Sequence, residues 1–304
     1  MLIMLLLMIS STMMAQVTTS GLNGKVVAGG ENVIGATITA IHEPSGTRYN
    51  AVTNESGRFT IQGMRVGGPY KVTVNYIGYK DEVIDNIQLS LGQPRTLNID
   101  MKEDAQQIGE VTVLGKGGRN SGGAAANFNQ QRIENTPTIS RNLYDVAKLS
   151  PLVSNSRLGG VSISGINNRY NSFQIDGTVS NDVFGLAGSG TNGGQTNANP
   201  ISMDAIQELQ VSVAPFDVRQ SGFTGGAINA ITKSGTNQFH GSAYMYYTNQ
   251  DMYSKYNRLR DYVEDKLSQR STKTYGATLG GPIIKNKLFF FASAEYKKTE
   301  APAT

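Results

Sequence analysis

Apolar and polar residues alternate over much of the N-terminal part of the chain. The clearest run has an apolar or aromatic side chain at every second position: Tyr70, Val72, Val74 and Tyr76. An earlier run places four apolar residues on one face of a strand: Ile34, Ala36, Ile38 and Ala40. Turn sequences such as residues 54–57 separate the runs. About seven strands with this period of two predict a small β-sandwich over residues 16–102.

Between residues 119 and 235 the pattern predicts a mixture of short helices and strands. We expect Ser140 and Ser202 to cap two short helices. Their apolar faces would carry Leu143, Val146 and Ala147 in the first, and Ala205, Ile206 and Leu209 in the second. Short strands are expected at residues 161–164, 172–175, 211–213 and 227–231. Asp176-Gly177 predicts a turn in which the carboxylate accepts local backbone hydrogen bonds and the glycine permits a positive φ.

The last part of the chain holds three segments of about ten residues with one apolar face and aromatic residues near their ends. A long polar stretch, residues 249–271, connects the first two, and a short turn near residues 281–286 connects the next two. Outer-membrane barrels have long external loops and short periplasmic turns. The pattern predicts the first strands of an antiparallel transmembrane β-barrel over residues 236–304, although a soluble sandwich also fits. Three strands cannot close a barrel in lipid, so we expect an N-terminal fragment.

The N-terminus predicts export. Residues 1–9 form an apolar run that ends in small residues up to Ala15, which is the pattern of a secretory signal over residues 1–15 cleaved before Gln16. A buried core segment is the alternative. After residue 15 no apolar run approaches the length of a membrane-spanning helix.

Composition excludes several classes of function. The chain has no Cys, two His and a net charge of +4 that is spread along the sequence. These features argue against a disulfide scaffold, a thiolate or multi-His metal site and a nucleic-acid partner. Gly188, Gly190 and Gly193 match a dinucleotide fingerprint in spacing, but the flanking sequence predicts no strand before it and no helix after it. We expect no cofactor, no catalytic residues and no enzyme activity.

Residues 103–118 form a Gly-rich linker that holds one short β-prone island. Its central residues are Glu110, Val111, Thr112 and Val113. Such an island could add as a strand to the sheet edge of a partner, where main-chain hydrogen bonds supply affinity. A small strand of the following domain is the alternative.

Several ordered motifs resemble known families. Residues 24–26, 35–38, 53–59 and 76–79 resemble the carboxypeptidase-regulatory-like domain. Further motifs resemble, in order, the plug domain of TonB-dependent outer-membrane receptors: residues 142–146, 151–153, 164–169, 174–177, 206–211 and 225–237. The hairpin at residues 279–291 is similar to the Oar-like branch of that family. The resemblance implies a plug domain at residues 119–235 and a mainly β chain of sandwich, α/β plug and incomplete barrel.

The resemblance also implies partners and a location. Residues 110–113 would be the TonB box, gripped by a TonB-type inner-membrane energy-transducing protein. The barrel would sit in outer-membrane lipid, with the sandwich and plug on the periplasmic side. An unknown extracellular solute would contact four plug-loop residues: Arg169, Tyr170, Asn181 and Asn192. The alternative for Arg169 is a structural salt bridge. A second hypothesis for the whole protein is a surface adhesin or matrix-binding protein that uses the β-sandwich.

Overall fold

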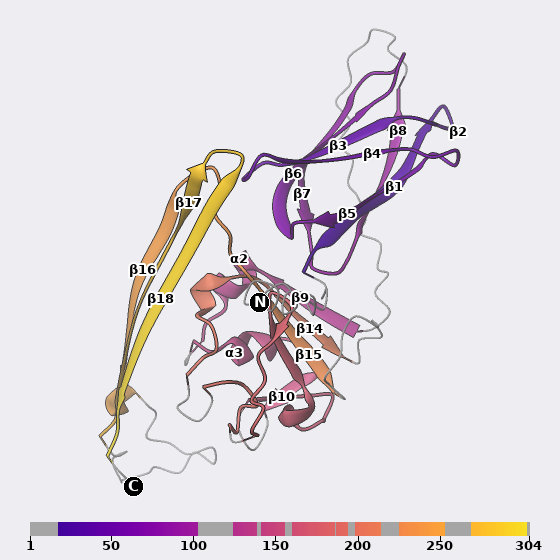
Figure 1. Cartoon of the computed structure of the whole chain (residues 1–304). Helices are drawn as coiled ribbons and strands as arrows, with labels where there is room; N and C mark the ends of the chain where they lie inside the picture. The colour runs from indigo at the N-terminus through magenta and orange to yellow at the C-terminus, as the bar shows by residue number, and fades with distance from the viewer. Residues whose placement is uncertain are drawn as a thin grey trace, which may run out of the picture. The chain divides into compact units, whose positions relative to one another are not determined.

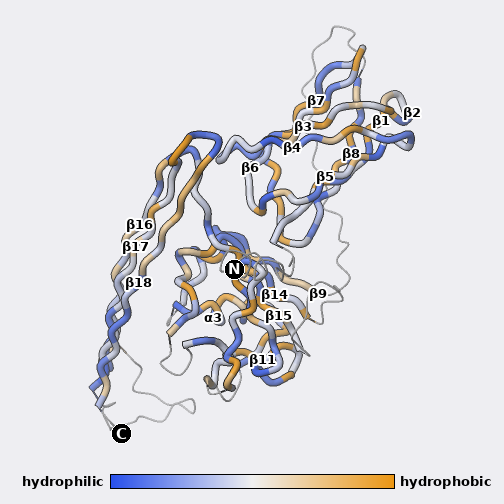
Figure 2. Tube along the Cα trace, in the orientation of Figure 1, coloured by the Kyte–Doolittle hydropathy of each residue, from blue (hydrophilic) through white to orange (hydrophobic). Residues whose placement is uncertain are grey.

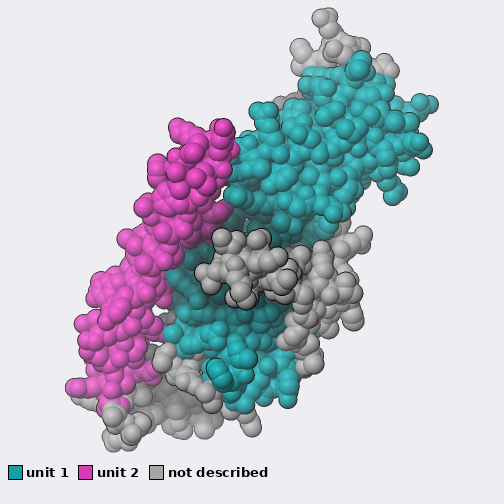
Figure 3. All heavy atoms as spheres, in the orientation of Figure 1, with its two compact units in different colours: residues 1–232 teal, residues 233–304 magenta. Residues whose placement is uncertain are grey.

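The computed structural model describes residues 18–102, 124–138, 141–155, 160–185, 187–193, 198–213, 225–252 and 269–302. The chain divides into two compact units, residues 1–232 and residues 233–304 (Figure 3). Unit 1 contains a β-sandwich, residues 18–102, and a mixed α/β region, residues 124–232. Unit 2 contains a three-stranded sheet. The predicted signal segment and the predicted linker island lie outside the described residues.

Eight strands form the β-sandwich (Figure 1). They are β1 (Ser20–Ala28), β2 (Glu31–Asn32), β3 (Thr37–His42), β4 (Thr47–Val52), β5 (Arg58–Met64), β6 (Gly67–Asn75), β7 (Glu82–Leu89) and β8 (Arg95–Met101). One sheet has the order β2-β1-β5 with β8 pairing β1 in parallel, and the other has the order β4-β3-β6-β7. This confirms the predicted two-sheet fold.

The alternating apolar residues meet between the two sheets. Tyr70, Val72 and Val74 are completely buried, and the alternation is visible along the tube in Figure 2. Each such side chain contributes roughly 1.5–3 kcal/mol by leaving water. The prediction was wrong for Ile34, which is 54% exposed. Gly35 has a φ of 81°, and this bend before β3 keeps Ile34 out of the face that Ala36 joins.

The α/β region is built on one five-stranded sheet with the order β13-β12-β15-β14-β9. Its elements are β9 (Ala124–Asn129), α2 (Gln130–Asn135), α3 (Leu143–Ala147), β12 (Ser172–Ile175), β13 (Thr178–Val179), β14 (Ile206–Val213) and β15 (Gly226–Thr232). A separate pair is formed by β10 (Val153–Asn155) and β11 (Val161–Ile163). Strands β12 and β15 run parallel, whereas the other pairs in the large sheet are antiparallel.

The first predicted helix is present, with a different cap. The side chain of Asn142 accepts a hydrogen bond from the Tyr144 N–H at 3.0 Å and begins α3. The predicted cap, Ser140, lies outside the described residues. Asn is as good an N-cap as Ser because its short side chain also carries an acceptor oxygen.

The second predicted helix was wrong. Ser202 does cap a turn, but the turn is the single 3-10 turn Met203–Ala205, and β14 begins at Ile206. From Glu208 to Val213 polar and apolar residues alternate strictly, which is the period of a strand. Pairing with β15 on one side and β9 on the other satisfies the backbone of this segment.

The large sheet has one apolar face and one polar face. Leu209, Val211 and Ile228 belong to a buried cluster that also includes Leu143 and Val146 of α3. The opposite face carries a row of amide side chains at cross-strand paired positions: Gln174, Asn229, Gln210 and Asn127. Three of these, Gln174, Asn229 and Gln210, are buried. A buried polar face needs hydrogen-bond partners, so this face is built to be covered by polar groups.

Unit 2 is an antiparallel sheet of β16 (His240–Asn249), β17 (Ser271–Ile284) and β18 (Leu288–Glu300) in that order. Asn286, with a φ of 62°, lies in the short turn between β17 and β18. The described residues form no closed barrel, in agreement with the expectation of an incomplete one. Most of the long polar connection before β17 lies outside the described residues.

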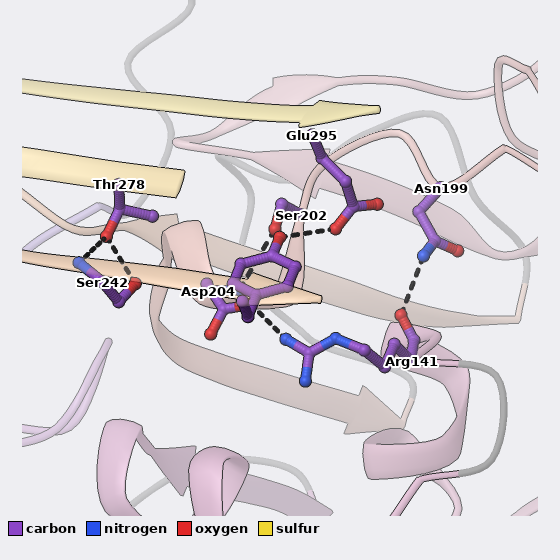
Figure 4. A network of polar contacts seen from close by, with 8 residues as sticks. Arg141, Asn199, Ser202, Asp204, Ser242, Thr278 and Glu295 are labelled. Atoms are coloured by element: carbon purple, nitrogen blue, oxygen red, sulfur yellow. Dashed lines mark hydrogen bonds and ion pairs between the residues drawn. The ribbon is translucent and has the colours of Figure 1, made fainter. Parts of the chain in front are cut away.

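One side-chain row crosses all three strands of this sheet. Tyr244 pairs with Gly276, which pairs with Glu295. A Cβ at Gly276 would lie 2.1 Å from the Tyr244 ring, so the glycine leaves room for the ring to cross β17. The Tyr244 hydroxyl then donates to Oε2 of Glu295 at 2.7 Å. On neighbouring strands Ser242 and Thr278 join their hydroxyls at 2.8 Å (Figure 4).

No helix among the described residues is both long enough and apolar enough to cross a membrane.

Candidate functional site

The short 3-10 helix Asn168–Tyr170 presents two of the predicted solute contacts. Its cap is Asn167, whose side chain accepts from the Arg169 N–H at 3.0 Å. Arg169 and Tyr170 are both exposed, and Tyr170 keeps 59% of its surface accessible. Within the described part of the chain, no carboxylate forms an ion pair with Arg169. The salt-bridge alternative for Arg169 therefore has no support from these residues.

Two buried asparagines fix this turn from below. The Asn168 amide donates to the carbonyl oxygen of Gly188. Asn171 donates from Nδ2 to the Val161 carbonyl at 3.0 Å and accepts at Oδ1 from the Gly226 N–H, also at 3.0 Å. Because the side chains at both ends of the turn point inward, the two residues between them face outward.

Asn181 is used by the fold itself. Its Oδ1 accepts from the Phe173 N–H at 2.7 Å, and its Nδ2 donates to the Asn171 carbonyl at 3.0 Å. The side chain thereby closes the edge of β12 in the way that a further strand would. Asn192, by contrast, is exposed, and its backbone N–H donates to the Ser180 carbonyl at 3.4 Å. Of the two predicted contacts, Asn192 is the one whose side chain faces outward.

The two asparagines give a matched test. We expect Asn181→Ala to destabilise the α/β region by roughly 1–3 kcal/mol for each backbone group left without its partner. Asn192→Ala should change stability by less than about 0.5 kcal/mol, as is usual at exposed positions. Urea unfolding, monitored by hydrogen exchange at the amides of β12, measures the stability of both variants. Equal stability of the two variants would contradict the structural role of Asn181.

The loop that follows exposes two large apolar side chains that the sequence analysis did not single out. Val183 is 89% exposed and Phe184 is 85% exposed. The Asp182 carboxylate accepts hydrogen bonds from the Phe184 and Ala187 N–H groups, which shapes the turn that carries them. The signal was present in the sequence, because Val183 and Phe184 are, with Leu186, the large apolar residues in a stretch otherwise rich in Gly and Asn. They join Arg169, Tyr170 and Asn192 as candidate solute contacts.

A buried hydroxyl pair holds the far end of this loop. The Tyr144 hydroxyl donates to Oγ1 of Thr191 at 3.2 Å, and both residues are buried. Burial raises the pKa of Tyr144, while the bond to Thr191 opposes the shift, so the phenol stays protonated. The adjacent cavity, lined in part by Asn168 and Phe173, measures about 10 Å³. That is room for one water and not for a solute.

A half-buried ion pair ties the end of the Gly/Asn-rich loop to the start of α3. The Arg141 guanidinium is directed at the Asp204 carboxylate, and the Asn199 amide donates to the Arg141 carbonyl at 2.8 Å (Figure 4). Ser202 accepts from the Asp204 N–H at 3.3 Å, which orients the acid. The chain on either side of the Gly/Asn-rich loop is therefore anchored to the folded part.

The predicted Asp-Gly turn is confirmed. Asp176 and Gly177 have φ values of 48° and 79° between the paired residues of β12 and β13. The expected local hydrogen bonds were wrong, because the carboxylate accepts from the N–H and the hydroxyl of Thr232, at 2.9 and 2.7 Å. Asp176 thus fastens the turn to the end of β15. No cluster of three or more potential metal ligands occurs within the ranges that the structure describes.

Separate parts of the chain resemble known protein families. Residues 21–102 match the carboxypeptidase regulatory-like domain, and residues 231–304 match an outer membrane beta barrel domain. The TonB-dependent transporter Oar of Myxococcus xanthus is 28% identical over 258 residues, which covers 79% of this chain and 23% of that protein. The chain is therefore similar to TonB-dependent outer-membrane receptors.

One further relative, a siderophore receptor, matches both in sequence and as a solved structure. The probable TonB-dependent siderophore receptor PirA of Acinetobacter baumannii is 34% identical over 106 residues, covering 34% of this chain and 12% of that protein. The crystal structure of that siderophore receptor aligns with 60% of this chain and 25% of its own chain, at 27% identity and a TM-score of 0.45. The chain therefore spans about a quarter or less of the length of the relatives it matches. The two relatives are a transporter and a probable receptor, and neither name describes an enzyme.

The predicted TonB box (Glu110, Val111, Thr112 and Val113) lies outside the described residues. The next described element is β9, which begins at Ala124 at the edge of the large sheet. The match of residues 231–304 to an outer-membrane barrel domain covers the three-stranded sheet and supports an outer-membrane location.

Proposed function

We propose that the whole protein is an importer that takes up a large or scarce solute across the outer membrane with energy from the inner membrane. In this proposal the α/β region, within residues 119–235, is the plug, and residues 236–304 begin the surrounding barrel. The observation that carries the proposal is the match to a TonB-dependent transporter over 79% of the chain. A match of that extent is longer than the β-sandwich, the α/β region or the three-stranded sheet taken singly.

Energy would enter through residues 110–113. A TonB-type protein would grip this β-prone segment by adding it to the edge of its own sheet. Pulling then does work that ligand binding alone cannot do, because a ligand shifts an equilibrium only by its differential affinity for the two states. The periplasmic side holds the sandwich and the α/β region in this proposal, and the signal at residues 1–15 would direct export.

Solute would be recognised on the outward-facing loops of the α/β region. Arg169, Tyr170 and Asn192 offer a cation and polar groups, and Val183 and Phe184 offer an apolar surface. Such a mixed surface suits a ferric siderophore, the class named for the Acinetobacter relative.

Deletion of residues 109–115 tests the coupling. We expect the variant to lose both copurification with the host's TonB-type protein and uptake of radiolabelled ferric siderophores, while surface display stays intact. A variant with the same seven residues in scrambled order is the control for linker length. Unchanged copurification would contradict the assignment of residues 110–113.

The two readouts separate the partner from the solute. Copurification that depends on residues 109–115, without siderophore uptake by the unaltered protein, would leave the import mechanism standing and reject the siderophore class.

A further inference from the structure

Two turns of the β-sandwich contact the α/β region. One is the turn at residues 90–93 after β7, where Leu91 is completely buried. The other is the turn at Val66 and Gly67, just before the body of β6. Val66 and Leu91 do not belong to the core between the two sheets of the sandwich; they pack with Ile231 of β15 in a separate apolar cluster. These side chains are buried because the α/β region covers them.

The main chain of Leu91 is bound by side chains of the α/β region. Its N–H donates to Oε1 of Glu208 at 3.0 Å. Its carbonyl oxygen accepts from Nε2 of Gln210 at 2.8 Å and from Nδ2 of Asn127 at 3.5 Å. Both polar groups of one peptide residue are therefore recognised by the polar face of the large sheet.

The second turn fits the same surface closely. Nε2 of Gln207 donates to the Val66 carbonyl at 3.1 Å. A Cβ at Gly67 would lie 2.4 Å from that nitrogen, and the φ of Gly67 is +89°. Glycine is therefore required at this position both for the backbone conformation and for the approach of Gln207.

The contact also gives the buried carboxyl group of Glu208 a hydrogen-bond partner. Glu208 is only 3% exposed, and burial raises its pKa to about 7 while the bond from Leu91 opposes the shift. A buried carboxyl group needs hydrogen-bond partners, and the sandwich supplies one. Without the sandwich, Glu208 and Gln210 would have to form these hydrogen bonds with water instead.

The carbonyl oxygen of Leu91 bridges two strands of the large sheet, β9 and β14. Asn127 lies on the edge strand β9 and Gln210 lies on β14, and the two residues are directly paired in the ladder. The Leu91 carbonyl accepts from both. We propose that the polar face of the large sheet is the docking site of the chain's own β-sandwich, and that the docked sandwich locks the edge strand β9 onto β14.

A mechanical consequence follows, and it rests on the proposed function. Residues 110–113 precede Ala124, the first residue of β9, in the sequence, so a pull on residues 110–113 would reach β9 at that end. Asn127 lies three positions further along, between the pulled end and the helix α2. The sandwich must therefore release Asn127 before β9 can be drawn off the sheet.

Hydrogen exchange in the full-length protein tests the lock without solute or energy-transducing partner. Leu91→Asp places a second acid beside Glu208 and should undock the sandwich. We expect amide exchange in β9 to accelerate on the order of 5- to 150-fold, the range of typical coupling energies between sites. Exchange in β3 should stay unchanged, because β3 packs in the sandwich core and Leu91 lies outside that core. Ile77→Asp, at a position of the same sandwich that is 95% exposed, is the matched control and should have no effect.

A second variant keeps the test decisive if the first misfolds. Asn127→Ala removes only the bond from β9 to the Leu91 carbonyl and should loosen β9 while exchange at the Leu91 amide rises in parallel, because coupling is reciprocal. Faster exchange at Leu91 with unchanged exchange in β9 would overturn the lock. Because neither measurement involves uptake, failure of the lock and failure of the proposed transport function give different results.

Discussion

Replacement of Gly24 by Val should prevent the β-sandwich from folding. Gly24 lies in β1, paired with Phe59 of β5 on one side and with Leu97 of β8 on the other. A Cβ there would lie 1.8 Å from the Leu97 carbonyl oxygen and 2.8 Å from a ring carbon of Phe59. The first of these atoms belongs to the backbone of a paired strand, so no side-chain rotation relieves the clash.

The loss of stability in Gly24→Val depends on which parts of the sandwich would have to move to make room for the new side chain. Ordinary overpacking of a core costs about 1–3 kcal/mol, because side chains and backbone adjust slightly. Here β8 would have to leave its ladder with β1, which runs over seven paired residues. Since whole domains are stable by only about 5–15 kcal/mol, we expect the loss to remove most of the stability of the sandwich.

Hydrogen exchange along the chain measures this result region by region. In Gly24→Val, amides of β1, β3 and β6 should lose protection, with the sandwich unfolded at a temperature where the unaltered protein is folded. Lys25→Val introduces the same side chain at the adjacent, half-buried position of β1 and is expected to leave protection intact. Retained protection in Gly24→Val would mean that β8 does not pack against β1 as described.

Sequence patterns predicted the β-sandwich and the three-stranded sheet of unit 2 well, because both depend on local alternation of apolar and polar residues. Tyr70, Val72 and Val74 alternate with polar residues, and all three are buried. The pattern failed at Ile34, where one glycine with a positive φ breaks the face. Alternation reports which side of a strand is buried, but it does not report where the strand begins.

The α/β region was predicted less well because its segments are short and their type is decided by their neighbours. Residues 205–209 show helix-like apolar spacing, yet Ile206–Val213 is a central strand between β15 and β9. The pairing partners come from distant parts of the chain, so no local signal could rank them. The strict alternation from Glu208 onward was the one local clue.

The candidate site could be located from the sequence, but the roles of its residues could not. Arg169, Tyr170 and Asn192 face outward as the prediction requires, whereas Asn181 completes the backbone hydrogen bonds of β12. Asparagine at a loop serves either role, and only its partners distinguish them. The docking face was missed for a similar reason, because Glu208 and Gln210 are polar residues that the sandwich buries.

Two buried titratable groups give unit 1 opposing responses to pH. Burial lowers the pKa of His42 in the sandwich from 6.5 to about 4, and the charge of Arg65 adds to the shift. The unfolded chain therefore takes up a proton first as the pH falls, and stability is lost between about pH 6.5 and 4. Burial raises the pKa of Glu208 from 4.5 to about 7, which has the opposite sign. The pH ranges of the two effects overlap and their signs are opposite, so the pH dependence of the total stability does not show either effect alone.

Glu208→Gln should separate them. In the unfolded chain Glu208 ionises above about pH 4.5, whereas in the folded chain it stays protonated up to about pH 7. Its contribution to stability is thus fully present below pH 4.5 and is lost as the pH rises to 7, by roughly 3 kcal/mol. Gln has nearly the same shape, can accept from the Leu91 N–H and does not titrate. The variant should therefore gain on the unaltered protein by that amount across this range.

The difference between the two proteins isolates Glu208, because His42 is present in both. The elements around β14 carry Arg132 on α2 and Lys233 after β15, but the shift of Glu208 arises from burial, opposed by the Leu91 bond, rather than from these charges. Urea unfolding of unit 1 at pH 4.5 and at pH 7.5 gives the two stabilities to be compared. A difference between Glu208→Gln and the unaltered protein that is the same at both pH values would show that Glu208 reaches water, and that the sandwich does not cover it.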